Sequence, residues 1–353
     1  MKQDIKKFKT DRGEITWITL TNRSGASVTL SSWGAGIVAL CVPDRCGNKA
    51  NVVLNYPRPE DYFDDGPCAG KTPGRYANRI GGGRLELDGV VYQLDVNNGP
   101  NHLHGGLEGF QNRNWECIPG DDVSTVAFKL KSPDGDQHYP GELTATVTYR
   151  WSESLNRLTI EYIAFVSGHP TVINLTNHTY WNLSGFQTPD ILGHKLKLPS
   201  KRYLATDDSL CPTGEIVPVK GTPMDFTAEC AVGQRLHDDY TALRQGKGYD
   251  ALWIIDNNTG RPVIAAELYD PASGRLLTVT TDQPGVQIYS GNWLSGCPDG
   301  PDGHKYADYS AVAIECQGYP DAPNHPDFPS QRLDTLDNDD IYNHTIEYTF
   351  TTK

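Results

Sequence analysis

Ten residues near the middle of the chain hold one imidazole within a run of amides, hydroxyls and aromatic rings. Residues 174–183 have the sequence Asn-Leu-Thr-Asn-His-Thr-Tyr-Trp-Asn-Leu, which contains His178. The β-branched and aromatic residues around it favour a strand. Because side chains alternate along a strand, every second side chain from Asn174 to Tyr180 would share one face. A histidine in such a polar row could transfer protons, or it could be a hydrogen-bonded core residue.

A second histidine cluster is Asn-His-Leu-His-Gly-Gly at residues 101–106. If this segment is a strand, His102 and His104 lie on one side of it, an arrangement that could suit a metal. No third nitrogen or thiolate ligand follows at a recognisable spacing, so we expect no metal site.

Other polar side chains stand where strands or tight turns are expected. Asn78 and Arg79 lie between glycines, although an arginine at a loop tip is usually only solvated. Asp250 begins one predicted strand, and Glu315 lies near the end of an apolar one. Local spacing cannot bring these residues together, so only the fold could make a site of them. The candidates are Asn78, Arg79, His104, His178, Asp250, Gln283 and Glu315.

The elements that must position these residues are predicted to be strands. Residues 142–151 alternate strictly between polar and apolar, and the pattern of residues 158–166 predicts that they form the antiparallel partner strand. Asp88-Gly89 between two alternating runs indicates a hairpin. Helix patterns are scarce. We expect an all-β fold, a large twisted antiparallel β-sandwich formed by residues 1–353 as a single domain. The other expected strands cover residues 14–21, 27–32, 36–42, 51–56, 263–270, 275–281, 283–289, 311–317 and 345–351.

The composition limits the classes of function. The 353 residues are 37% hydrophobic and 21% charged, which is typical of a soluble, turn-rich globular protein. The net charge of −13 disfavours nucleic acid and anionic membranes as partners. Residues 1–10 lack the apolar core of a signal peptide, and no apolar run is long enough to span a membrane. The eight cysteines are scattered singly, so we expect reduced thiols and a cytoplasmic protein.

Six blocks of sequence together resemble the aldose 1-epimerase (galactose mutarotase) family, and they follow the family's order over nearly the whole chain. The resemblance implies a β-supersandwich of the galactose mutarotase-like type. It also implies interconversion of the α and β anomers of free aldohexoses such as galactose and glucose, without a cofactor. The blocks are Gly-Arg-Tyr-Ala-Asn-Arg-Ile at 74–80, Asn-His-Leu-His-Gly-Gly at 101–106, the stretch at 174–183, Thr-Gly-Glu-Ile at 213–216, Gln-Pro-Gly-Val-Gln at 283–287 and Glu-Cys-Gln-Gly-Tyr-Pro-Asp-Ala-Pro-Asn at 315–324.

Carried over position by position, the resemblance assigns roles to the candidates. Glu315 matches the catalytic base and His178 the catalytic acid, with His104 as a second site histidine. The substrate-binding positions are Asn78, Arg79, Asp250 and Gln283, joined by Tyr180 as an aromatic residue that could stack on a sugar. His102 and Trp181 depart from the family pattern, and a longer loop at 296–304 leaves the sugar preference open.

The reaction fits these residue types. Mutarotation needs the anomeric hydroxyl deprotonated and the ring oxygen protonated, which gives an open aldehyde that can close to the other anomer. One base and one acid on opposite sides of the sugar would suffice. A glutamate with a reference pKa of about 4.3 is ionised at neutral pH, so Glu315 suits the base. A nearby carboxylate would raise the pKa of His178 above its reference of about 6.5 and favour the acid form.

Three alternatives stay open from the sequence. A non-catalytic carbohydrate-binding β-sandwich would need no acid–base pair. A glycosidase could use Asp250 with Glu315 as its two carboxylates. A phosphosugar (hexose-6-phosphate) 1-epimerase should gather more basic residues than Arg79 and the nearby Arg75. The sequence also leaves open whether the protein is a monomer or a homodimer. It does not decide whether the aromatic residues Trp181, Trp253 and Tyr319 contact sugar.

Overall fold

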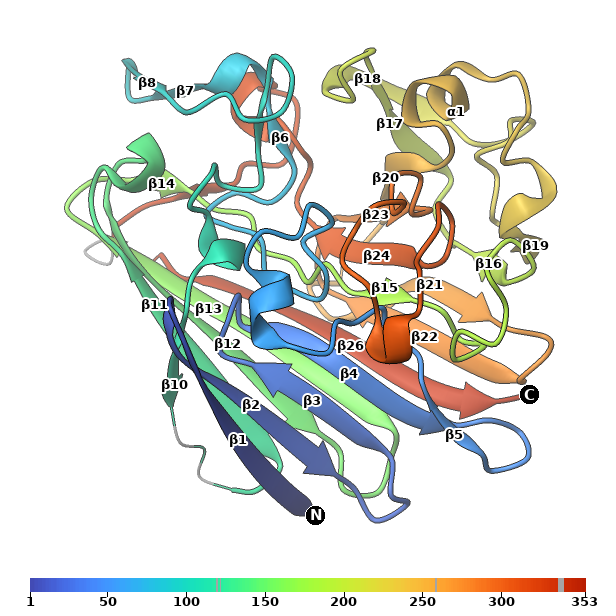
Figure 1. The fold of residues 1–353 in the computed structure, drawn as a ribbon. Helices are drawn as coiled ribbons and strands as arrows, with labels where there is room; N and C mark the ends of the chain where they lie inside the picture. Colours follow the sequence, from blue (N-terminus) through green and yellow to red (C-terminus); the bar gives the residue numbers. More distant parts are fainter. Residues whose placement is uncertain (119, 121, 258, 336–339) are drawn as a thin grey trace.

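The strand content of the sequence is realised in three large sheets. The computed structural model describes residues 1–118, 120, 122–257, 259–335 and 340–353. Within that part, the strand pairs that form the sheets are antiparallel, and the one α-helix is the short α1 (Thr241–Gly246). Figure 1 shows the sheets stacked against each other with few helices between them. The expected all-β, antiparallel class is confirmed.

The first part of the chain forms a five-stranded sheet in sequential order. The predicted strand over residues 51–56 is wrong beyond Asn51, because the segment after it bonds to two separate strands: the Val52 N–H to the Leu40 carbonyl and the Leu54 N–H to the Tyr180 carbonyl. The strand β1 was not predicted, since its charged residues do not alternate with apolar ones. The five strands are β1 (Lys2–Thr10), β2 (Gly13–Thr21), β3 (Ser27–Ser31), β4 (Gly36–Pro43) and β5 (Lys49–Asn51).

A nine-stranded sheet contains the strands with the clearest sequence alternation. Its order is β10-β11-β12-β13-β26-β22-β21-β16-β19. The predicted pairing of residues 142–151 with residues 158–166 is confirmed by the register Thr146↔Ile163. The strands are β10 (Glu116–Ile118), β11 (Thr125–Ser132), β12 (Glu142–Trp151), β13 (Arg157–Ser167), β16 (Lys195–Lys197), β19 (Cys230–Ala231), β21 (Val263–Tyr269), β22 (Arg275–Thr281) and β26 (Tyr342–Thr352).

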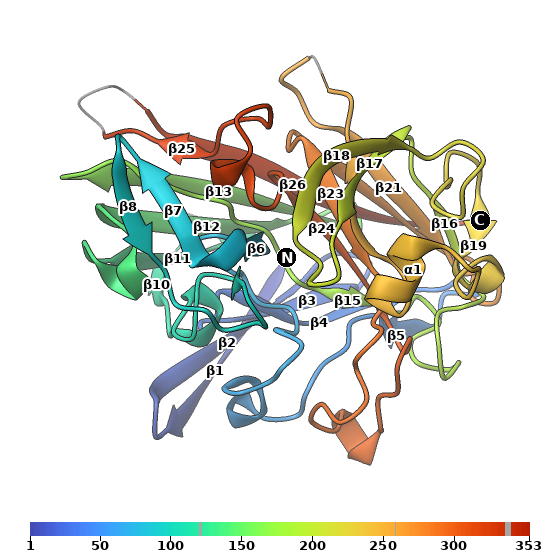
Figure 2. The ribbon, with the colours of Figure 1, turned by 90° about the horizontal axis from the view of Figure 1, so that it is seen from above.

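A six-stranded sheet completes the large layers, with the order β15-β24-β23-β20-β17-β18. Figure 2, seen from above, places α1 and the β17–β18 pair on one side of the molecule and the β7–β8 hairpin on the other. The strands are β15 (Tyr180–Trp181), β17 (Arg202–Thr206), β18 (Pro212–Pro218), β20 (Asp250–Ile254), β23 (Gly285–Tyr289) and β24 (Val312–Gln317).

Short elements connect the sheets. The Asp88-Gly89 hairpin is confirmed as β7 paired with β8. None of the described helices is long and apolar enough to cross a membrane. The remaining strands are β6 (Arg79–Ile80), β7 (Arg84–Leu87), β8 (Val90–Gln93), β9 (His102–Leu103), β14 (Thr171–Val172) and β25 (Arg332–Leu333), and the 3-10 helices are η1 (Pro59–Tyr62), η2 (Gly81–Gly83), η3 (Phe110–Asn112), η4 (Asp136–His138), η5 (Val232–Gln234), η6 (Pro301–Gly303) and η7 (Ala322–Asn324).

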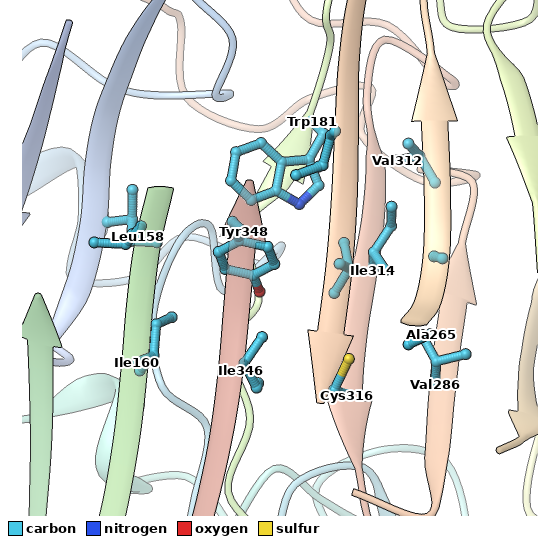
Figure 3. Close-up of a cluster of buried hydrophobic side chains, with 14 of the residues drawn as sticks. Leu158, Ile160, Trp181, Ala265, Val286, Val312, Ile314, Cys316, Ile346 and Tyr348 are labelled. Atoms are coloured by element: carbon cyan, nitrogen blue, oxygen red, sulfur yellow. The ribbon is translucent and has the colours of Figure 1, made fainter. Parts of the chain in front are cut away.

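The main hydrophobic core joins all three sheets. It includes Leu30 of β3, Val147 of β12 and Ile314 of β24, each fully buried. Figure 3 shows Ile314 and its neighbours on β24 alongside Ile346 and Tyr348 of β26. Burial of such a side chain contributes about 1.5–3 kcal/mol. The six-stranded sheet therefore has one face fixed in the core, which leaves its other face for a site.

Candidate active site

The free face of the six-stranded sheet forms one wall of a cavity of about 760 Å³. Loops that contain residues 98–104 and 208–210 complete the cavity, so segments far apart in the sequence meet there. The predicted site residues that line it are Asn78, Arg79, His104, His178, Tyr180, Asp250 and Glu315.

The period of two along each strand decides which side chains reach the cavity. On β24, Ile314 and Cys316 belong to the core, and Glu315 between them lines the cavity. On β23, Gln287 lines the cavity and lies directly across the sheet from Glu315. On β20, Asp250 lines the cavity at the first residue of the strand. Three neighbouring strands therefore present one amide and two carboxyl groups side by side.

His178 reaches the cavity from an extended segment, not from the predicted strand. Only Tyr180–Trp181 of residues 174–183 is a strand, β15. The His178 main chain is held instead by the neighbouring loop, since its N–H donates to the Lys71 carbonyl and its carbonyl accepts from the Gly70 N–H, both at 2.9 Å. Gly70 has a φ of +73°, and a Cβ there would lie 2.0 Å from the Ile37 carbonyl oxygen. A glycine is therefore required where this loop supports His178.

His178 and Glu315 face each other directly. The His178 Nε2 lies 3.5 Å from the Glu315 Oε1, and both side chains are buried. The expectation that the two residues stand on opposite sides of a sugar is wrong for this structure, because 3.5 Å leaves no room for a ring between them. The pair instead faces the cavity together, beside Tyr180, whose ring centroid is 5.0 Å from that of His178.

Burial shifts both members of this pair toward their neutral forms. It lowers the pKa of His178 to about 4. Burial, followed by repulsion from Asp250, raises the pKa of Glu315 well above its ordinary value, although Arg79 opposes this. The expectation that the pKa of His178 would lie above its reference value is therefore wrong, because desolvation is the largest cause of the shift and the charge of Lys71 also lowers it. Burial therefore favours the neutral imidazole and the neutral carboxyl group over the charged forms of the pair.

Three other predicted site residues, Asn78, Arg79 and His104, are fixed by hydrogen bonds or by unusual backbone conformations. Asn78 and His104 have φ values of +64° and +54°, which are unusual outside glycine. The Asn78 N–H donates to the His104 Nδ1 at 3.1 Å, so the Nδ1 accepts and the Nε2 carries the proton of the neutral ring. The Arg79 Nε donates to the Asn98 Oδ1 at 3.2 Å. Backbone strain of this kind collects at functional sites.

Comparison with known proteins identifies the family. The model described as Aldose 1-epimerase matches residues 16–349. The galactose mutarotase of Rattus norvegicus is 39% identical over 324 residues, which cover 92% of this chain and 91% of the relative. The aldose 1-epimerase of Escherichia coli (strain K12) is 39% identical over 313 residues, or 88% of each chain. The chain belongs to the aldose 1-epimerase family.

Solved structures agree with this membership. An aldose epimerase homologue from C. elegans superposes with a TM-score of 0.87 at 32% identity, covering 95% of this chain and 98% of that one. A galactose 1-epimerase from Lactobacillus acidophilus gives a TM-score of 0.86 at 26% identity, covering 100% and 99%. The predicted galactose mutarotase-like fold is confirmed. Membership in the aldose 1-epimerase family gives the chain its activity, that of an isomerase acting on sugars.

One predicted substrate-binding residue of this family member lies elsewhere. Gln283 does not line the cavity, and its Nε2 donates to the Tyr342 hydroxyl at 3.0 Å, in a separate hollow of about 380 Å³. Gln287 takes the position instead and donates to the Asp250 Oδ1 at 2.6 Å. Both glutamines belong to the block at 283–287, but only Gln287 alternates with the apolar Val286 and Ile288. That alternation could have distinguished them.

Several other side chains singled out from the sequence do not line the cavity. His102 is fully buried and bonds to the Tyr139 hydroxyl and the Asp95 carbonyl, so the two histidines of residues 101–106 do not act together. Trp181 and Trp253 belong to the main core, and Tyr319 to a smaller hydrophobic cluster. Among the described residues, no group of three or more His, Cys, Asp or Glu side chains is placed to hold a metal ion.

Sequence reasoning missed the outer part of this family member's cavity. Tyr289 follows Gln287 on the same face of β23, and Trp293 and residues 294–297 come after the strand. Part of the loop at 296–304 therefore reaches the cavity through Gly296 and Cys297. No block of the resemblance covers Trp293, so nothing in the sequence pointed to it.

Proposed function

We propose that the chain interconverts the α and β anomers of free aldohexoses such as galactose and glucose, with His178 and Glu315 exchanging the protons. The observation that carries this proposal is the 3.5 Å contact between the His178 Nε2 and the Glu315 Oε1 on the cavity wall. The two sugar oxygens that must exchange protons, O1 and O5, are bonded to the same carbon. An acid and a base that lie side by side can therefore reach both oxygens from one edge of the sugar.

Ring opening uses the arrangement in which Glu315 is ionised and His178 is protonated. Glu315 accepts the proton of the O1 hydroxyl, and the electrons of that O–H bond form the C1=O1 double bond. The C1–O5 bond breaks, and O5 takes the proton from His178. The product is an open-chain aldehyde facing a neutral carboxyl group and a neutral imidazole. Burial favours these neutral forms, as the directions of both pKa shifts indicate.

Ring closure reverses the transfers after rotation about the C1–C2 bond. The O5 hydroxyl attacks the other face of the aldehyde while His178 takes its proton and Glu315 returns a proton to O1. No covalent intermediate or cofactor is required, and the pair ends with the proton it began with. Tyr180, fixed by the bond from its hydroxyl to the Pro67 carbonyl at 3.0 Å, supports the imidazole during both steps.

The charges of the cavity favour a neutral sugar. Its lining carries the carboxyl groups of Asp208, Asp250 and Glu315 but only one guanidinium, that of Arg79. A hexose 6-phosphate would bring a dianion to this acidic surface, so the phosphosugar alternative has less support. Asp250, Gln287, Arg79 and His104 supply acceptors and donors suited to hydroxyl groups. Galactose is the first sugar to test because the mammalian relatives are named galactose mutarotases.

The test is polarimetry of freshly dissolved α-galactose and α-glucose. We expect the wild-type protein to accelerate the approach to anomeric equilibrium far above the buffer rate, and glucose 6-phosphate to be a poorer substrate. A rate equal to that of buffer for both free sugars would refute the proposal. Gel filtration of the same sample decides between monomer and homodimer, and the cytoplasmic location stays a prediction.

A further inference from the structure

A buried ion pair lies in the segment that supports His178. The Lys71 ammonium donates to the Asp65 Oδ1, and the side chains of Lys71 and Asp65 are only 2% and 0% exposed. Burial raises the pKa of Asp65, and the charge of Lys71 opposes that shift. An enclosed ion pair contributes little net stability, because the desolvation of both charges offsets their attraction. Stability alone therefore does not explain why charges are buried here.

The pair closes the segment between its two members, which we call the 65–71 loop. The other carboxylate oxygen of Asp65 accepts from the Ala69 N–H at 2.7 Å. The Lys71 ammonium also donates to the Tyr62 carbonyl, just before the loop, at 2.8 Å. The first and last residues of the loop are thus joined through their side chains, so the conformation of the loop depends on this pair.

The 65–71 loop in turn holds the residues of the site. The Lys71 carbonyl accepts from the His178 N–H, and the Gly70 N–H donates to the His178 carbonyl, both at 2.9 Å. The Pro67 carbonyl accepts from the Tyr180 hydroxyl at 3.0 Å, and Pro67 itself lines the substrate cavity. The loop therefore fixes both the main chain of the histidine and the aromatic ring beside its imidazole.

The Lys71 side chain is confined along its length. Its stem packs against Gly34, where an added Cβ would lie 2.8 Å from the Lys71 Cγ. Its ammonium lies between the Asp65 carboxylate, the Tyr62 carbonyl and the Asn112 Oδ1, the last at 3.4 Å. A side chain held in this way has lost its rotational freedom already on folding, so it can act as a rigid support for the loop.

Proton transfer depends steeply on such support, because a displacement of about 1 Å in a reacting group can cost about a hundredfold in rate. Resting on the proposed function, we propose that Asp65 and Lys71 are positioning residues for the reaction. Their ion pair holds the 65–71 loop in the conformation that presents the imidazole of His178 to Glu315.

The test replaces both members of the pair at once, because a single substitution would leave a buried charge unpaired and destabilise the fold. Asp65→Asn/Lys71→Met removes both charges, and the asparagine keeps an acceptor for the Ala69 N–H. We expect polarimetry with galactose to show kcat about tenfold lower and KM within about twofold of the wild-type value, because the imidazole shifts while the sugar-binding side chains stay. The melting temperature should change little. Arg84→Gln/Glu86→Gln removes an exposed ion pair of β7 and is the matched control, which should leave kcat and KM unchanged.

The pH profile is a readout that a merely structural role would not move. Burial lowers the pKa of His178 to about 4, and the charge of Lys71 lowers it further. The other ionisable groups that face this imidazole are unchanged in the double variant: Glu315 at 3.5 Å, the ring of His104 at 5.4 Å and the ring of Tyr180 at 5.0 Å, the last two between centroids. The step in kcat near pH 4 should therefore move to a higher pH when the charge of Lys71 is removed.

The outcomes separate this inference from the proposed function. If the wild-type protein does not accelerate mutarotation, the proposed function fails and the inference falls with it. If the wild-type protein is active and the double variant keeps its kcat, or loses kcat with no shift of the pH step, only the inference is overturned. A double variant that is unfolded at the assay temperature also overturns it, because the pair would then be required for the fold itself. A lower kcat with an unchanged KM and a shifted pH step supports it.

Discussion

The two faces of β24 belong to one strand, yet they have different roles. On one face, Ile314 and Cys316 are fully buried against the core and Tyr348 of β26. On the other, Glu315 is equally enclosed but carries a carboxyl group whose pKa burial raises. The apolar face stabilises the fold. The polar face is destabilising by the same physics, since desolvating an ionisable group costs free energy.

This contrast shows how the fold supports reactivity. The rigid apolar packing on one face fixes the strand and with it the position of Glu315 relative to His178. The buried environment on the other face then shifts the pKa values of the pair together. A substitution on one face should therefore change stability, and a substitution one residue along should change activity. Variants on the two faces of β24 test whether stability depends on one face and activity on the other.

The largest effect should come from Glu315→Gln. The amide keeps the shape of the side chain but cannot accept the O1 proton, so we expect kcat to fall about a thousandfold. The melting temperature should stay the same or rise, because a buried ionisable group has been removed. Polarimetry and thermal unfolding measure the two quantities, and Glu142→Gln at the exposed first residue of β12 is the matched control. A large loss of stability with full activity would reverse the roles of the two faces.

On the opposite face, Ile314→Ala should destabilise the protein by about 2–5 kcal/mol, because it leaves a cavity among fully buried side chains. The kcat of the folded fraction should stay within about twofold of the wild-type value if the strand keeps its position. Urea unfolding with polarimetry on the same samples checks this. A fall in activity without a fall in stability would contradict this, because it would show that the core face directly positions the reacting groups.

The sequence predicted the strands of the sheets better than the loops. Strict alternation located the strand at residues 142–151, and an apolar run located the strand of Glu315, which is buried along its whole length. The segment of His178 was misassigned as a strand, since it is buried on both sides and is held by a loop contributed from residues 70–71. That contact depends on the tertiary fold, and no local pattern encodes it.

The resemblance to the family identified most residues of the site. It did not predict their protonation states, and it pointed to Gln283 where Gln287 lines the cavity. The shifted pKa values of His178 and Glu315 arise from burial, which the spacing of residues in the chain does not reveal. The alternation of Gln287 with Val286 and Ile288 could have separated it from Gln283, and the register of β23 against β24 places it opposite Glu315.

The two glutamines offer a smaller test of the same contrast. Gln287→Leu removes a sugar-facing donor and the bond to Asp250, so we expect KM to rise about tenfold with a modest effect on kcat. Gln283→Leu breaks the bond to the Tyr342 hydroxyl outside the cavity, so it should cost about 1 kcal/mol of stability and leave KM unchanged. Equal changes in KM for the two variants would mean that Gln287, on the cavity face of β23, does not contribute specifically to substrate binding.

The smallest effect concerns pH. The pKa of His178 is lowered to about 4, so the titration of this imidazole should add no step to the rate profile near neutral pH. At pH 4 about half of the His178 side chains carry an added proton, so we expect the step in kcat near that pH. The contribution of His178 to folding stability should fall as the pH drops below its unfolded pKa of about 6.5, whereas the raised pKa of Glu315 acts in the opposite direction. A rate that halves near pH 6.5 would show that burial does not control the imidazole.

The most direct test of the shared proton pair is a crystal structure of Glu315→Gln with galactose bound, a variant slow enough to hold the sugar. Our account predicts that O1 and O5 of one galactose lie within hydrogen-bond distance of residue 315 and His178 respectively, with its far side toward Trp293. A sugar whose anomeric carbon faces the cavity mouth, away from both side chains, would contradict it.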